Sequence, residues 1–221
     1  MPFTTRDDFL ERAQTRLAPA DAVLTGYERT DFDLTPDFPF PGKPPYRRAA
    51  VLVGLIDRAD DFGVLLTLRP DTMSQHAGQV AFPGGRIDPG DASPIAAALR
   101  EANEEVGVDP FSARVLGQGD PYLTSTGYVV SPFVARLPDD FVATPHDAEV
   151  AAVFETPLSF LMNPLNHQRH ERSYQGHLRA YYAMPHNGRY IWGATAGMIR
   201  SLYDRIYGEG DQPAPARGEI T

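Results

Sequence analysis

The sequence contains no cysteine. This absence excludes disulfide bonds, thiol nucleophiles and metal sites built from thiolates. The sequence also lacks any apolar run approaching the roughly 18 residues that cross a bilayer as a helix. The N-terminal stretch MPFTTRDDFLERAQ carries charges early and lacks the apolar segment of a signal peptide. We therefore expect no membrane partner and a cytoplasmic location.

Positive charge is also scarce. The chain has 20 Lys and Arg against 29 Asp and Glu, which gives a formal net charge of −9. Proteins that bind nucleic acid through its phosphates are usually basic, so we expect no nucleic-acid partner. An acidic protein that acts on an anionic small molecule needs a metal ion to reverse the sign of the local charge.

The length of 221 residues suits one large domain with its own core. We predict a main domain over residues 47–207. Residues 1–46 are expected to form an N-terminal helix and a Pro-rich extended arm, and residues 208–221 a flexible tail. The arm either wraps the core or contributes to a homodimer contact, and the sequence is compatible with both.

In the main domain, predicted strands lie before and after a central helix, and another helix follows at the end. Short apolar runs bounded by turns predict strands, and apolar residues that recur every three to four positions predict helices. The predicted strands cover 49–56, 63–69, 80–82, 114–118, 120–124, 129–137, 149–154, 180–184 and 190–192. The predicted helices cover 5–18, 94–106 and 194–207, with a helix or turn at 156–162. This order predicts an α/β fold layered around a mixed sheet.

The stretch 94–106 carries helix signals at both ends. Ser93 is a favourable N-cap, Pro94 suits the first helical position, and Gly107 suits a left-handed stop. The apolar residues between these signals form one stripe at helical spacing. They are Ile95, Ala98, Leu99, Ala102 and Val106.

Three carboxylates share one face of this predicted helix. Glu101, Glu104 and Glu105 stand at i, i+3 and i+4. Like charges at this spacing repel, so the arrangement adds nothing to stability unless a cation lies between them. Clustered hard oxygen ligands suit Mg²⁺ or Mn²⁺. A solvated acidic helix face is the alternative interpretation.

The segment ahead of the helix is rich in Gly and Pro. Pro83-Gly84-Gly85 and Pro89-Gly90-Asp91 predict a tight loop. Glycines such as Gly84 and Gly85 allow the backbone to approach a ligand closely. A loop of this kind that leads into a carboxylate-bearing helix predicts a cradle for a metal-bound diphosphate.

These residues together resemble the Nudix hydrolase signature, Gly-x5-Glu-x7-Arg-Glu-U-x-Glu-Glu-x-Gly-U, where U is aliphatic. The second half fits from Arg100 to Val108. In the first half, Asp91 stands in place of Glu, and one extra residue separates it from Arg100. The resemblance implies a Nudix-type α/β/α sandwich with a mixed central sheet over roughly residues 47–207.

The resemblance also implies roles for individual residues. Glu101 and Glu105 match the most consistent Mg²⁺ ligands of the family, and Glu104 matches a further ligand or a base acting through water. Arg100 is placed to hold a carboxylate in its rotamer or to relieve charge on the helix. Glu149 opens a predicted strand after a loop, so it is a candidate general base, with an ordinary edge-strand Glu as the alternative.

Two segments outside this signature are similar to the coenzyme A pyrophosphatase subfamily. One runs from Leu65 to Arg69 and continues from His76 into the signature, and the other covers 191–197, IWGATAG. The resemblance implies Mg²⁺-dependent cleavage of coenzyme A or its thioesters into 4′-phosphopantetheine, or its acyl form, and adenosine 3′,5′-bisphosphate. Arg69 is a candidate for a substrate phosphate contact, with an exposed strand-end charge as the alternative.

Residues 167–179 form a local basic patch in an acidic chain. We select His170 and Arg172 as candidates for binding the 3′-phosphate of coenzyme A. A solvated loop is the alternative, and a zinc site using His167 and His170 lacks a third ligand. Core packing explains Trp192 and nearby tyrosines better than stacking on adenine does.

Two other functions compete with coenzyme A hydrolysis. One is a Nudix enzyme for NADH or ADP-ribose, and the other is a catalytically silent module that binds a nucleotide. The complete set of Glu101, Glu104 and Glu105 favours an active enzyme.

Overall fold

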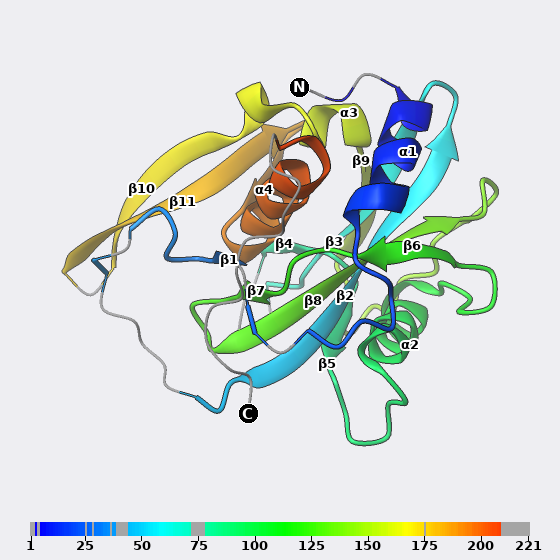
Figure 1. The fold of residues 1–221 in the computed structure, drawn as a ribbon, viewed down its shortest axis with the longest axis horizontal. Coiled ribbons are helices and arrows are strands. Elements are labelled where there is room, and N and C mark those ends of the chain that lie inside the picture. The colour runs from blue at the N-terminus through cyan, green and yellow to red at the C-terminus, as the bar shows by residue number, and fades with distance from the viewer. Residues whose placement is uncertain are drawn as a thin grey trace.

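The computed structural model of the chain describes residues 3, 5–24, 26–27, 29–35, 37–38, 44–71, 78–174 and 176–208 (Figure 1). Some expectations from the sequence fall outside these residues. They concern His76, parts of the Pro-rich arm, and the tail from residue 209 onward.

In the described part of the chain, runs of strands are separated by single helices, as Figure 1 shows. The helices are α1 (Arg6–Arg16), α2 (Pro94–Val106), α3 (Leu158–Leu161) and α4 (Ala194–Tyr207), with a 3₁₀ turn at Pro164–Asn166. The first strands are β1 (Arg29–Thr30), β2 (Arg47–Arg58), β3 (Asp61–Leu68), β4 (Val80–Ala81), β5 (Gly84–Arg86) and β6 (Arg114–Gln118). The later strands are β7 (Tyr122–Leu123), β8 (Tyr128–Leu137), β9 (Ala152–Pro157), β10 (Gln168–Tyr174), β11 (His177–His186) and β12 (Arg189–Trp192).

The first nine strands form one mixed sheet. Its hydrogen-bonded order is β1-β7-β8-β2-β3-β4, and β5, β6 and β9 pair with β2, β8 and β3 respectively. The central strand β2 runs parallel to β8 and antiparallel to β3 and β5. Leu52 and Ile56 of β2 join one buried cluster, while Val53 and Leu55 join another. Both faces of β2 are therefore covered, which explains its nearly continuous apolar sequence.

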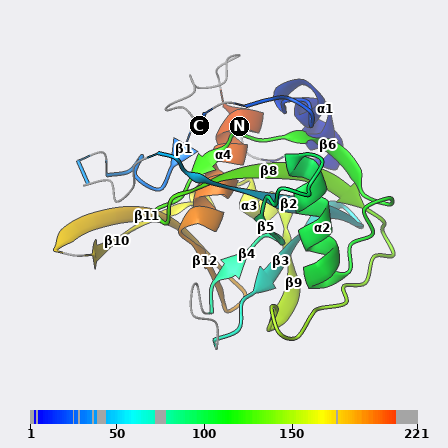
Figure 2. The ribbon, with the colours of Figure 1, turned by 90° about the horizontal axis from the view of Figure 1, so that it is seen from below.

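Helices cover both faces of this sheet (Figures 1 and 2). On one face, α2 packs through small residues such as Ala98 and Ala102, which let it approach the strands closely. On the other face, α1 contributes Phe9 and α4 contributes Ile199 and Leu202 to the largest buried cluster. The predicted α/β/α sandwich with a mixed sheet is confirmed.

The ends of α2 follow from local sequence. The Ser93 side chain accepts a hydrogen bond from the Ala96 N–H at 3.2 Å, and Pro94 occupies the first turn. Gly107 ends the helix in the left-handed region at φ 75°, where a side chain would be strained. These contacts fix the bounds of the helix that carries the carboxylates.

A second sheet, β10-β11-β12, lies beside α4. Met184 and Ile191 on one face are fully buried in the core cluster shared with α4. The β10–β11 hairpin extends away from the body of the molecule (Figures 1 and 2). The sequence assigns no element to residues 167–179 and leaves a solvated loop as one alternative, whereas the structure places β10 and the start of β11 there. β10 is polar on both faces, so it lacks the alternation that reveals a strand.

Described parts of the N-terminal arm pack on the chain's own core. Phe32 is buried, and the Ala180 N–H donates to the Thr35 hydroxyl at 3.0 Å. Asp31 accepts a 2.9 Å hydrogen bond from the buried Tyr122 hydroxyl and forms a 2.8 Å ion pair with Arg179. Of the two alternatives for the arm, wrapping the core therefore holds for these residues.

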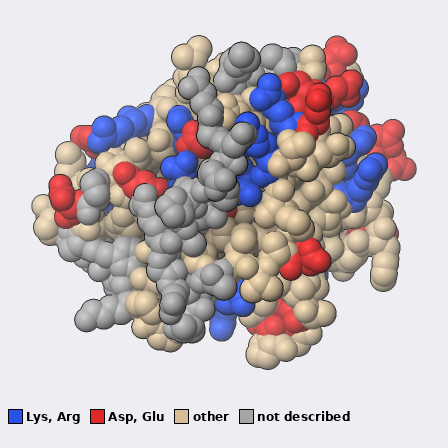
Figure 3. All heavy atoms as spheres, viewed as in Figure 1, with Lys and Arg blue, Asp and Glu red and all other residues tan. Residues whose placement is uncertain are grey.

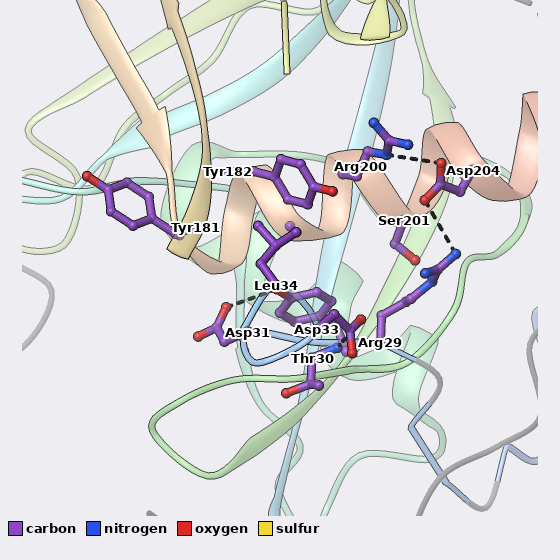
Figure 4. A pocket seen from close by; sticks show the side chains of 13 residues that line it. Arg29, Thr30, Asp31, Asp33, Leu34, Tyr181, Tyr182, Arg200, Ser201 and Asp204 are labelled. Atoms are coloured by element: carbon purple, nitrogen blue, oxygen red, sulfur yellow. Dashed lines mark hydrogen bonds and ion pairs between the residues drawn. The ribbon is translucent and has the colours of Figure 1, made fainter. Parts of the chain in front are cut away.

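The arm, β11 and α4 enclose a small polar cavity (Figure 4). Arg29 from the arm and Arg200 from α4 both bind the Asp204 carboxylate there, at 3.3 and 3.0 Å. The cavity measures about 50 Å³, which is room for a few water molecules and far below the volume of a nucleotide site. It is therefore part of the arm's packing.

Three predicted element positions need correction. Gly84 and Gly85 belong to strand β5, which pairs with Ala50 and Val51 of β2, whereas the sequence predicts a turn. The strand predicted at 149–154 is β9, which begins at Ala152, and the strand predicted at 120–124 is limited to β7. These shifts arise because the pairing partner, and not local composition, sets where a strand begins.

The charged surface agrees with the sequence. Acidic and basic side chains are interspersed on the face seen in Figure 3, without a continuous basic stripe across the described residues. Among the helices that the structure describes, none is both long and apolar enough to cross a membrane.

Candidate functional site

The three carboxylates of α2 lie in different environments. Glu105 is 5% exposed, the Glu101 side chain is 18% exposed, and the Glu104 side chain is 55% exposed. The three carboxylates share one helix face, but their burial decreases from Glu105 to Glu101 to Glu104. Burial of two neighbouring carboxylates has an electrostatic cost that a bound cation would offset.

Glu105 is fixed by the neighbouring strand β5. Its Oε2 atom accepts a hydrogen bond from the Gly84 N–H at 3.1 Å. Gly84 has φ +149°, and a Cβ there would lie 2.4 Å from the Ala50 carbonyl oxygen, so only glycine fits. Burial raises the pKa of Glu105 to about 7, against the opposing effects of the Gly84 N–H and the Arg69 charge.

Glu101 lies directly against Gly85. A Cβ at position 85 would lie 2.5 Å from the Glu101 carboxyl carbon, so the glycine provides the space for this carboxylate. Burial is the main cause that raises the pKa of Glu101, and the charges of Glu104 and Glu149 act in the same direction. Both glycines thus shape the carboxylate pair. The Gly84 N–H is occupied by Glu105, which differs from the substrate contact expected from the sequence.

Arg100 joins the loop to the carboxylates. Its Nε and Nη2 atoms donate to the two oxygens of Asp91 at 2.9 and 3.0 Å, and Nη1 donates to Glu101 and Glu104, both at 3.0 Å. The hydrogen bond to Asp91, followed by that to Glu101, raises the pKa of Arg100. The predicted contact between Arg100 and the cluster is present in the structure.

Asp91 is the partner that sequence analysis missed. Its side chain is only 6% exposed, and the fork-shaped contact with Arg100 holds the pKa of Asp91 below its usual range. The Asp88 N–H also donates to Asp91 at 2.8 Å. The sequence contains a signal for this role, because Asp91 lies in the loop that leads into the helix carrying Arg100. The extra residue between Asp91 and Arg100, and Asp in place of Glu, obscured that signal.

Arg69 stands immediately after β3, beside Glu105. Its backbone N–H donates to the Gln79 carbonyl, and its own carbonyl accepts from the Gly78 N–H. Its positive charge lowers the pKa of Glu105. Within the described part of the chain, the buried Nε atom of Arg69 has no hydrogen-bond partner. The structure thus brings Arg69 to the carboxylates with a donor still available.

Glu149 approaches the same carboxylates from a loop. The His146 N–H donates to the Glu105 carbonyl at 2.9 Å, which fastens the loop to the last turn of α2. Glu149 lies in a turn after His146, with its side chain half exposed. Its charge raises the pKa of both Glu101 and Glu105, so it lies within electrostatic reach of them. The position is a turn rather than the predicted start of a strand.

His170 and Arg172 lie elsewhere. Both belong to β10, and Figures 1 and 2 show the β10–β11 hairpin and α2 on opposite sides of the molecule. His170 bonds to the Tyr190 hydroxyl and to the Gln168 side chain. Within one chain, the structure does not bring these two residues to the carboxylates.

The carboxylates have the chemistry of a hard-cation site. Among the described residues, no three His, Asp or Glu side chains converge closely enough to hold a metal. Arg100 donates to both Glu101 and Glu104 in this arrangement. The donor set nevertheless fits Mg²⁺ or Mn²⁺, because its donors are all oxygen atoms on one helix face. Burial and mutual repulsion disfavour the ionised form of these carboxylates. A divalent cation between the carboxylates would offset both the cost of burial and the repulsion.

Comparison with known proteins identifies the family. The NUDIX domain family matches residues 45–176, more than half of the chain. This chain belongs to the Nudix family. A relative named "Uncharacterized Nudix hydrolase NudL" from Escherichia coli strain K12 is 43% identical over 162 residues, covering 71% of this chain and 81% of the relative. The protein of that name from Enterobacter sp. strain 638 is 44% identical over 161 residues, with the same coverage.

Solved Nudix structures are more distant. A MutT/nudix family protein from Enterococcus faecalis has a TM-score of 0.47 at 17% identity, covering 92% of this chain and 75% of that one. A NUDIX hydrolase from Alicyclobacillus acidocaldarius has a TM-score of 0.44 at 22% identity, covering 53% and 81%.

Family membership gives the reaction class. This Nudix protein is a hydrolase that acts on phosphoric anhydrides, with a nucleoside diphosphate derivative as substrate. Nudix hydrolases generally use Mg²⁺ or Mn²⁺, in agreement with the donor set of Glu101, Glu104 and Glu105. The names of the relatives do not specify the group attached to the diphosphate.

Proposed function

We propose that this Nudix hydrolase cleaves the diphosphate bond of coenzyme A or its thioesters. The products would be 4′-phosphopantetheine, or its acyl form, and adenosine 3′,5′-bisphosphate. The Nudix signature alone accounts for the diphosphate, so the identity of the substrate rests on features outside it.

One structural observation supports this substrate most directly. The two segments that resemble the coenzyme A subfamily, 65–82 and 191–197, meet at strand β4. The Thr195 hydroxyl donates to the Val80 carbonyl at 2.9 Å, and Val80 in turn pairs with Leu68 of β3. From β4 the chain leads within a few residues to Gly84 and Gly85. Segments more than 100 residues apart in sequence (Val80 and Thr195 are 115 apart) therefore meet at the strand that leads into Gly84 and Gly85.

The proposed metal ligands are Glu101 and Glu105, with Glu104 as a further ligand. When bound, the cation would neutralise the diphosphate oxygens and lower the pKa of a bound water. The chain's own part is to hold these carboxylates in place: Gly84 fixes Glu105, Gly85 gives Glu101 its space, and Arg100 orients Glu101 and Glu104.

The other side chains would handle the substrate and the proton. Arg69 would bind an oxygen of the diphosphate through its buried Nε donor, which has no partner among the described residues, as a charge-assisted hydrogen bond. Glu149, carried on the loop fastened to α2, would accept the proton of the attacking water. Glu104, which is more exposed than the other two carboxylates, is the second candidate for this base.

A contact of His170 or Arg172 with the 3′-phosphate stays a prediction. A charge-assisted contact of about 1.5–3 kcal/mol gives roughly a ten- to hundredfold preference for coenzyme A over dephospho-coenzyme A. Their place on the distant hairpin does not support a contact within one chain.

The test is kcat/KM for coenzyme A, dephospho-coenzyme A, NADH and ADP-ribose, measured with one enzyme batch at saturating Mg²⁺. The proposal predicts the highest value for coenzyme A or one of its thioesters. Equal values for coenzyme A and dephospho-coenzyme A would contradict the predicted 3′-phosphate contact but not the proposed reaction. A clear preference for NADH or ADP-ribose would overturn the substrate, and binding without turnover would favour a silent module.

A further inference from the structure

Strand β10 is an open edge of the second sheet. Among the residues that the structure describes, β10 pairs only with β11, and it lies on the outer side of the molecule (Figure 1). It spans seven residues, QRHERSY, without proline or glycine. About half of the backbone N–H and C=O groups of such a strand point away from its neighbour, where another strand can bind them.

This edge is held in place by contacts across the sheet. The His170 Nδ1 atom lies 2.7 Å from the Tyr190 hydroxyl of β12, and Nε2 lies 3.0 Å from the Gln168 side chain. The His170 ring also contacts the rings of Tyr181 and Tyr190. The strand is therefore ordered and extended before any partner arrives, which lowers the entropy that pairing must overcome.

The charges of β10 alternate in sign on one face. Arg169 and Glu171 are about half exposed and form a loose 3.5 Å ion pair with each other, so both remain available to a partner. Charged residues often protect an edge from pairing, but they do so when the charges repel those of the approaching strand. The sign of that interaction depends on the register.

We propose that β10 pairs antiparallel with β10 of a second copy of this chain, forming a six-stranded sheet across a two-fold axis at His170. In this register Arg169 lies opposite Glu171 of the partner subunit, and Glu171 opposite Arg169 of the partner subunit. Gln168 lies opposite Arg172 of the partner subunit. Opposite charges directly across two strands attract, and the two-fold axis makes the favourable pair occur twice.

Symmetry leaves few other registers. A two-fold axis normal to the sheet keeps each side chain on its own face, so the axis must pass between a residue and its own copy. An axis at Arg169, at Glu171 or at Arg172 would place like charges directly opposite each other. His170 is the centre that yields two Arg–Glu pairs and no like-charged pair.

Charge reversal tests this register in the full chain. Dimer dissociation is measured by analytical ultracentrifugation over a concentration series for wild type, Arg169→Glu, Glu171→Arg and the double variant. Each single reversal turns two attractive pairs into repulsive ones, so the dissociation constant should rise about tenfold or more. The double variant restores opposite charges and should restore the dimer. Arg114→Glu on β6, an exposed arginine outside the proposed interface, is the control for net charge and should leave the constant unchanged.

Cross-linking gives an independent measurement, because the native chain has no cysteine. With oxidised glutathione, His170→Cys should form a covalent dimer, since the two copies of residue 170 face each other. Ser173→Cys is the matched control: three residues from the axis, its two copies lie about 20 Å apart and cannot bridge. Circular dichroism checks that each variant is folded.

The outcomes are distinct from those of the substrate assay, which reports on the carboxylates of α2. A wild-type monomer at all concentrations would overturn the proposal. So would a dimer that is insensitive to Arg169→Glu, or cross-linking of Ser173→Cys in place of His170→Cys. Loss of the dimer in both single variants and its return in the double variant would establish the register.

Discussion

At the scale of single residues, the carboxylate of Glu105 is buried, and burial raises its pKa. Its pKa of about 7 in the folded protein lies above the value near 4.5 for an exposed Glu, so folding favours its protonated form. The loss of folding stability from ionising Glu105 is absent below about pH 4.5 and grows as the pH rises toward 7. Above pH 7 the loss is complete. In the metal-free protein this loss is on the order of 3 kcal/mol at most.

The first prediction concerns Glu105→Gln. In EDTA-treated protein, the free energy of unfolding of wild type should fall relative to the variant as the pH rises from about 4.5 to 7, because only wild type must ionise a buried group. Urea titrations at several pH values measure the difference. Added Mg²⁺ should stabilise wild type and leave the variant nearly unchanged. Parallel pH curves for the two proteins would contradict the buried ionisation.

The second prediction concerns Asp91, which acts through Arg100. Asp91→Asn should lower kcat by roughly ten- to hundredfold, as loss of a supporting contact to a metal ligand commonly does. The matched control is Asp88→Asn, since Asp88 is 60% exposed and 3.8 Å from the same guanidinium. Steady-state kinetics should show little change for Asp88→Asn. Equal losses of kcat in the two variants would contradict a specific role for the paired hydrogen bonds between Asp91 and Arg100.

At the scale of elements, the strand that ends at Arg86 shapes the site through two glycines. The third prediction is that Gly85→Ala lowers turnover by at least an order of magnitude, because the new Cβ would lie 2.5 Å from the Glu101 carboxyl carbon and displace it. Gly90→Ala in the loop that follows this strand is the control, since nothing lies within 4 Å of a Cβ there. Similar turnover in both alanine variants would show that Glu101 has room to move.

The fourth prediction concerns the loop that carries Glu149. If Glu149 accepts the proton of the attacking water, Glu149→Gln should lower kcat with little change in KM and flatten the acid limb of the pH profile. Glu104→Gln measured alongside separates the two candidate bases. An acid limb that persists in Glu149→Gln and disappears in Glu104→Gln would transfer the role to Glu104.

Some helices and strands could be predicted from the sequence and others could not. The bounds of α2 were predictable because Ser93, Pro94 and Gly107 act within one turn of the helix. β5 was not, because two glycines read as a turn until β2 provides a pairing partner. β10 was missed for a related reason: its seven polar residues are strand only because β11 pairs with them. The fork between Asp91 and Arg100 depends on loop geometry that spacing alone does not give.

At the scale of the whole molecule, the fold separates the carboxylate site from the edge of the second sheet. The large sheet and α2 hold the carboxylates, and the second sheet presents an open edge on the other side of the body (Figures 1 and 2). Residues far apart in sequence meet at β4, where Thr195 of α4 binds Val80. This meeting could not be predicted from either segment, because it is produced by the packing of α4 against the sheet.

The central claim is that Glu101 and Glu105, with a divalent cation, hydrolyse the diphosphate bond of coenzyme A. The fifth and most direct measurement is product analysis by ³¹P NMR and mass spectrometry after incubation with coenzyme A and Mg²⁺. Wild type should give 4′-phosphopantetheine and adenosine 3′,5′-bisphosphate in equal amounts, while Glu101→Gln, Glu105→Gln and EDTA-treated protein should lose this turnover by several orders of magnitude with the fold intact. Intact coenzyme A after prolonged incubation with wild type, or unchanged cleavage by either Gln variant, would contradict the account.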